Sequence, residues 1–88
     1  MGVRIDLNGA QGELRLGGRT VARLWNWRLK VRAEGYKLTA RMTEADDYWL
    51  EHGGPYQAQL GSTWQVQGEI ERDGDEMVMR GTGKPTSI

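Results

Sequence analysis

The chain has 88 residues, with 12 Lys and Arg balanced by 12 Asp and Glu, and no cysteine. This length predicts a single domain, residues 1–88, with a thin hydrophobic core, and the lack of cysteine excludes a disulfide framework and a thiolate metal site. A net charge of zero argues against a dedicated nucleic-acid-binding protein, and we expect no membrane span and no signal peptide because no apolar run is long enough.

The first segments alternate apolar and polar residues, as half-buried strands do. Residues 3–7 predict a first strand, which the Asn-Gly pair at positions 8–9 ends as a turn. Residues 13–16 predict a second strand. The Gly-Gly pair at positions 17–18 joins it to a third strand as a hairpin, because both positions can adopt positive φ.

The third strand is the longest alternating run, in residues 19–35. It places Trp25 and Trp27 at apolar positions, and Arg28, Lys30 and Arg32 at the polar positions between and after them. We therefore expect both tryptophans to face the core and the cations to face water. The alternation loses phase before Trp25, which predicts a β-bulge near residues 22–24.

Residues 36–42 alternate again and predict a fourth strand. The periodicity then becomes helical in residues 43–54, where Ala45, Tyr48, Trp49 and His52 share one face. Thr43 is the expected N-cap, and the Gly-Gly-Pro segment at 53–55 ends the helix. We expect two to three helical turns.

The last third returns to alternation in residues 64–70. The segment Arg-Asp-Gly-Asp at 72–75 predicts a hairpin turn, and residues 77–79 begin a last strand that frays into the C-terminal residues. Together these patterns predict a mainly β fold, a small antiparallel β-sandwich or barrel of six to seven strands with one short α-helix.

Few residues suggest catalytic chemistry. His52 is the sole histidine in the sequence and is expected to interact with the end of the helix. The acidic residues of 44–51 are interpreted as stabilising the helix N-terminus. The segment GTGKPTS, residues 81–87, lacks the first glycine of a phosphate-binding loop. We therefore predict no enzyme activity, no catalytic residue, no cofactor and no metal.

The cations of the third and fourth strands form a candidate binding face. They are Arg23, Arg28, Lys30, Arg32, Lys37 and Arg41. Sheets that bind single-stranded nucleic acid place aromatic rings on the same face as the cations. Here the tryptophans are expected on the opposite face. The cations could instead pair with Glu69 and Glu71 of a neighbouring strand or subunit.

A family resemblance rests on two stretches, GELRLGGRTVARLWNWRLKVRAEGYKLTARM at 12–42 and STWQVQGEIERDGDEMVMRGTG at 62–83. The first resembles the opening of tail-tube (major tail) proteins of tailed bacteriophages, in its Gly-Gly turn, the VARL strand at 21–24, Trp27, the Glu-Gly break at 34–35 and Thr39. The second resembles their closing hairpin. Many tail-tube subunits are larger than this chain.

The resemblance implies a non-enzymatic virion protein, made in the host cytoplasm, that self-assembles into rings. Such rings are often hexameric, contact other virion proteins and stack into a tube through which DNA passes as cargo. The alternatives are a capsid decoration or stabilising protein and a small phage-encoded module that binds nucleic acid or protein.

Candidate subunit contacts follow from exposed edges and aromatic rings. Free strand edges are expected at residues 3–7 and 77–81, which makes Ile5 and Val78 interface candidates. Tyr48 and Trp49 are candidates because a short helix leaves large rings partly uncovered. Alternatively, the two rings close one end of the barrel within a single subunit.

Overall fold

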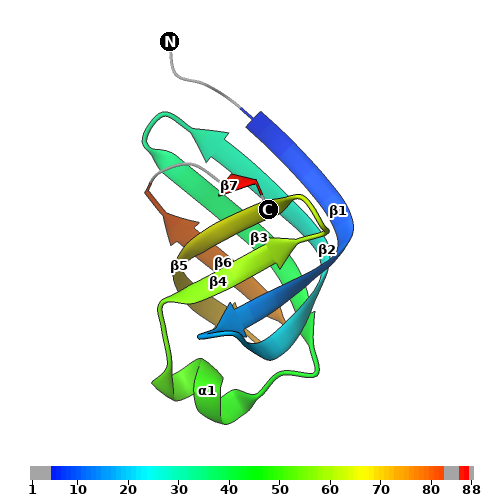
Figure 1. Ribbon diagram of the computed structural model, residues 1–88, viewed down its shortest axis with the longest axis vertical. Coiled ribbons are helices and arrows are strands. Elements are labelled where there is room, and N and C mark those ends of the chain that lie inside the picture. The colour runs from blue at the N-terminus through cyan, green and yellow to red at the C-terminus, as the bar shows by residue number, and fades with distance from the viewer. Residues whose placement is uncertain (1–4, 83–85, 88) are drawn as a thin grey trace.

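A computed structural model describes residues 5–82 and 86–87, and it confirms the predicted fold class. The chain forms a closed, six-stranded antiparallel barrel with one short helix at one end (Figure 1). The elements, in chain order, are β1 (Ile5–Leu16), β2 (Arg19–Arg32), β3 (Gly35–Thr43), α1 (Asp47–His52), β4 (Tyr56–Leu60), β5 (Trp64–Asp73), β6 (Glu76–Gly81) and β7 (Thr86–Ser87).

The strands follow the order β4-β1-β2-β3-β6-β5, and pairing of β4 with β5 closes the barrel. The short β7 pairs only with the start of β5, at Trp64 and Gln65. The closing strand β4 is also short and meets β1 only at residues 12–15. Residues 5–10 of β1 therefore pair with β2 on one side and with no described strand on the other.

Alternate residues of the barrel strands fill the core. In β3 the buried side chains are Tyr36, Leu38, Ala40 and Met42, as the sequence pattern predicted. The strand β4 repeats this alternation with Tyr56, Ala58 and Leu60, although sequence reasoning did not identify it as a strand. No polar or charged side chain of the described residues is fully buried.

The first strand is longer than predicted, because β1 runs without a turn through positions 8–9. Gly9 pairs with Trp27 of β2. A Cβ atom at Gly9 would lie 2.5 Å from the indole ring. The glycine therefore serves close packing within a strand rather than a turn, and the two predicted N-terminal strands are one.

Two irregularities in β2 replace the single predicted bulge at 22–24. Val21 is an extra residue opposite β1, and a second register shift opposite β3 lies between Trp25 and Arg28. Asn26, inside that second shift, has φ 51°. As a result Trp27 enters the core at 5% exposure. The prediction was wrong for Trp25, which is half-buried and donates its indole N–H to the Thr43 hydroxyl at 2.6 Å.

The helix is shorter than predicted. It has six residues, about one and a half turns, and begins after Asp46 rather than after Thr43. Thr43 is the last residue of β3. The predicted hairpin at 72–75 is confirmed, with Gly74 at φ 63°. Beyond β6, the expected fraying gives way to β7 at residues 86–87, while 83–85 and 88 lie outside the described residues.

Candidate functional site

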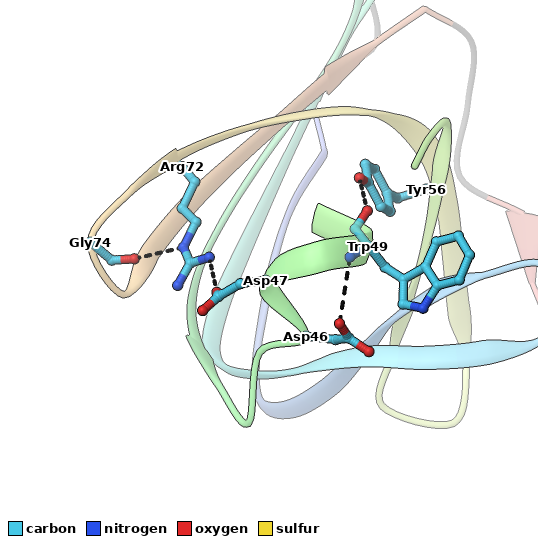
Figure 2. A network of polar contacts seen from close by, with 6 residues as sticks. All are labelled: Asp46, Asp47, Trp49, Tyr56, Arg72 and Gly74. Carbon is cyan, nitrogen blue, oxygen red and sulfur yellow. Dashed lines mark hydrogen bonds and ion pairs between the residues drawn. The ribbon is translucent and has the colours of Figure 1, made fainter. Parts of the chain in front are cut away.

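The helix α1 closes one end of the barrel. Trp49 and Leu50 are half-buried and pack against the core cluster. The Tyr56 hydroxyl donates to the Trp49 carbonyl oxygen at 2.6 Å, and the Asp46 carboxylate accepts from the Trp49 backbone N–H at 3.5 Å (Figure 2). Trp49 therefore fits the alternative in which this ring closes the barrel within one subunit.

One arginine joins the β5–β6 turn to the helix. The Arg72 guanidinium donates to the Gly74 carbonyl oxygen at 3.0 Å and to the Asp47 carboxylate at 2.6 Å (Figure 2). The Asp47 side chain is 71% exposed and the Arg72 side chain 36%, so solvent screens this ion pair and it stabilises the fold by only about 0.2–1 kcal/mol. Its consequence is geometric, because it places the turn beside α1.

Tyr48 differs from its neighbour. It is 62% exposed, and its ring contacts Trp49 edge-on at 5.1 Å and His52 at 4.8 Å between centroids. Ile5, at 39%, is the other exposed large hydrophobic residue of the described chain. The start of β1 and the helix α1 lie at opposite ends of the long axis (Figure 1). Two predicted interface residues are thus exposed at opposite ends.

The predicted edge at residues 77–81 is wrong. Strand β6 pairs with β3 on one side and with β5 on the other, so Val78 lies opposite Thr39 and Glu71. Its side chain is half-buried. The described part of the other predicted edge remains open, because no described strand covers the outer side of residues 5–10.

Three cations lie side by side across three strands on the outer surface. Lys30 of β2 pairs in register with Lys37 of β3, and Lys37 pairs with Arg80 of β6. We call these three exposed residues the basic row. Asp6 of β1 and Glu69 of β5 occupy the next register positions at its two ends. Like charges directly opposite one another are unfavourable, so this alignment costs the fold stability.

Three of the predicted surface cations have acidic partners. Arg23 pairs with Glu44 at 2.7 Å, Arg41 with Asp75 at 2.9 Å and Arg32 with Asp6 at 3.3 Å. By contrast, Lys30, Lys37 and Arg28 form no ion pair with any described residue. Sequence reasoning identified these cations but not their alignment, because the alignment depends on strand register.

The carboxylates of residues 44–51 are dispersed rather than gathered. Glu44 pairs with Arg23, Asp46 caps α1, and Asp47 pairs with Arg72. Within residues 5–82 and 86–87, no group of three or more His, Cys, Asp or Glu side chains is arranged to hold a metal ion. The exposed His52 is the last residue of α1, as expected from the sequence. Part of the segment 81–87 lies outside the described residues.

Two buried tyrosines have perturbed acidity. Burial raises the pKa of Tyr36, whose hydroxyl donates to the Gln67 carbonyl oxygen. Burial also raises the pKa of Tyr56, and the nearby Glu69 carboxylate adds to that increase. Both hydroxyls lie on the barrel wall and hydrogen-bond to backbone carbonyls, which is a structural role.

Comparison with known proteins gives no relative. No protein-family model matches the chain, and neither the curated proteins nor the solved structures contain a significant match. No helix within the described residues has the length and apolar character needed to cross a membrane.

Proposed function

We propose that this protein is a non-enzymatic structural subunit that assembles with copies of itself, as tail-tube subunits of tailed bacteriophages do. In this proposal it works in the virion and is assembled in the host cytoplasm, and the assembled unit is a ring. The resemblance of residues 12–42 and 62–83 to tail-tube proteins supports a location in the phage tail, and the free edge of β1 supports self-assembly.

The observation that carries the proposal is the unpaired side of β1. Residues 5–10 extend beyond the short closing strand β4, so their outer backbone groups have no strand partner in the described chain. An exposed strand edge offers N–H and C=O groups that another strand can complete. Ile5, at 39% exposure, adds apolar surface at the start of the same edge. The net charge of zero keeps repulsion between copies low.

The test introduces a charge at this edge. Ile5→Lys places an ammonium group where the neighbouring copy would add its strand, because lysine at an edge opposes pairing. Ser62→Lys adds the same charge to the exposed β4–β5 turn and serves as the matched control. Sedimentation velocity and negative-stain images of both variants and of the wild type report the assembly state.

We expect the wild type and Ser62→Lys to form the same oligomer and Ile5→Lys to sediment as a smaller species with unchanged circular dichroism. A folded Ile5→Lys variant that assembles like the wild type would remove the edge from the proposal. A wild type that stays monomeric at high concentration would overturn self-assembly itself.

A further inference from the structure

Charge is divided unequally along this neutral chain. Residues 1–41 contain nine of the 12 Lys and Arg and three of the 12 Asp and Glu, whereas residues 42–88 contain three and nine. The fold carries part of this division into space. Lys30 of β2 and Lys37 of β3 lie near the β2–β3 turn, while the acidic helix α1 lies at the other end of the barrel (Figure 1). The remaining cations of these two strands include Arg19, Arg23 and Arg41, which contact Trp49, Glu44 and Asp75 near the α1 end.

The positive surface is centred on the basic row. Arg28 extends it along β2, because it lies two positions before Lys30, and like it is exposed. Arg28, Lys30 and Lys37 form no ion pair with a described residue. Arg80 reaches only Glu71, at 3.4 Å between exposed side chains. The basic row and Arg28 together form a surface that we call the basic face.

The negative surface lies where α1 meets the β5–β6 turn. The Arg72–Asp47 ion pair and the hydrogen bond from Met42 N–H to the Asp75 carbonyl oxygen hold the turn in this place. Three exposed carboxylates there have no ion pair within the described chain, and we call them the acidic end: Glu51, Asp73 and Glu76.

We propose that the basic face of one copy docks on the acidic end of the next. The three unpaired cations and the three unpaired carboxylates are complementary in sign and number. Lys30 and Lys37 lie near the β2–β3 turn, whereas Arg28 lines the same surface hollow as Asp73 and Glu76. Attraction across such a contact would offset the repulsion among Lys30, Lys37 and Arg80, which within the described chain is relieved only by the flanking acids and by the ion pair of Arg80 with Glu71. In this proposal each copy uses its basic face for one neighbour and its acidic end for another, and such a heterologous contact generates a ring or an open filament.

A second copy fits the basic face better than a nucleic acid does. A polyanion-binding domain normally carries a basic surplus, whereas this chain sums to zero. Asp6 and Glu69 also border the basic row at both ends, and they would repel a phosphate backbone that crosses it. A small acidic surface avoids repulsion from Asp6 and Glu69, because it can contact the cations of the basic row alone.

This inference rests on the proposed self-assembly. Charge-reversal variants test the docking contact separately from self-assembly itself. One variant, Lys30→Glu/Lys37→Glu, reverses the basic face. A second, Glu51→Lys/Glu76→Lys, reverses the acidic end. The control Lys30→Arg/Lys37→Arg keeps the charge. The self-association of each protein is measured by sedimentation velocity at roughly 0.05 M and roughly 0.5 M salt, which spans weak to strong screening.

We expect each charge-reversal variant alone to associate at least about tenfold more weakly than the wild type, and the Arg control to match it. An equimolar mixture of the two should recover the assembly, because every contact between the two different variants is again complementary. The wild-type oligomer should dissociate partly at the higher salt.

Four outcomes overturn the proposal. If both folded variants assemble alone as the wild type does, the charges do not form the contact, although self-assembly stands. If the mixture fails to assemble while each variant keeps the wild-type circular dichroism, the two surfaces are not partners. If the variants assemble normally and only the reversed basic face loses binding to a labelled DNA duplex, the face serves a nucleic acid. A wild type that is monomeric at both salt concentrations overturns the self-assembly proposal as well.

Discussion

Gly9 of β1 lies opposite Trp27 of β2, and the indole ring occupies the space that a side chain at Gly9 would fill. The ring is 5% exposed, and its N–H donates to the Gln11 carbonyl oxygen at 2.7 Å. This contact joins the first two strands of the barrel at the level where β1 leaves the closing strand β4.

We predict that Trp27→Ala lowers the free energy of unfolding by about 3–5 kcal/mol, as other buried aromatic truncations do. The loss combines the buried ring area with the cavity that remains. Chemical denaturation of the isolated domain measures it. Trp25→Ala is the comparison, because Trp25 is only half-buried, and it should cost clearly less. Equal losses at the two positions would contradict the assignment of Trp27 to the core.

We predict that Gly9→Ala destabilises the fold by about 1–3 kcal/mol, because the added methyl group meets a ring held in a packed core. The exposed neighbour Ala10 supplies the control. Ala10→Ser should change the unfolding free energy by less than about 0.5 kcal/mol, as surface changes usually do. Near-neutral behaviour of Gly9→Ala in the same denaturation experiment would show that the contact is loose.

The sequence pattern identified the core through alternation but could not identify this contact. Residues 36–42 and 64–70 reveal their buried faces locally, because a strand exposes every second side chain. Gly9 and Trp27 meet only through the pairing of β1 with β2. Without that register, an Asn-Gly pair favours a turn, and two strands were predicted where one exists.

The missing strand register also explains why the candidate surfaces were only partly predicted. The cations of β2 and β3 are visible in the sequence, but the row of Lys30, Lys37 and Arg80 depends on two registers. Strand β6 was expected at an edge because it comes late in the chain, whereas the barrel places it between β3 and β5. The open side of β1 was predicted correctly for the described residues, because the short β4 pairs only with residues 12–15 of β1.

The two aromatic residues of α1 should behave differently on substitution. We predict that Trp49→Ala costs about 1–3 kcal/mol of stability, because the ring packs against the core. Tyr48→Ala should cost less than about 0.5 kcal/mol, since the ring is 62% exposed. Thermal or chemical unfolding of the two variants distinguishes them. A larger loss for Tyr48 would mean that the helix is rotated about its axis.

Asp46→Ala tests how the short helix is held. The Asp46 carboxylate accepts from the Trp49 backbone N–H, and we predict a loss of about 0.5–2 kcal/mol without this cap. Asp47→Ala is matched in chemistry and position but removes only an exposed ion pair with Arg72, so it should cost no more than about 1 kcal/mol. A greater effect at Asp47 than at Asp46 would contradict the capping assignment.

Alkaline pH should destabilise the barrel through Tyr36. Burial raises its pKa above the ordinary value of 10.0, so the folded state disfavours the ionised form. The corresponding stability is fully present below pH 10 and is lost as the pH rises through the folded-state pKa. We predict that the denaturant concentration at the unfolding midpoint of the wild type falls above pH 10, and that this fall is shallower for Tyr36→Phe.

At neutral pH the Tyr36→Phe variant should lose about 1 kcal/mol of stability, because it lacks the hydrogen bond to Gln67. Parallel pH profiles for the two proteins would exclude Tyr36 as the source.

The central claim is that copies of this chain assemble with one another, and sedimentation of the wild type over a wide concentration range at low salt tests it most directly. We expect the sedimentation coefficient to rise with concentration to that of a closed oligomer, and the same sample to show rings or stacked rings in negative stain. A single species with the mass of one 9.9 kDa chain at every concentration would contradict the claim.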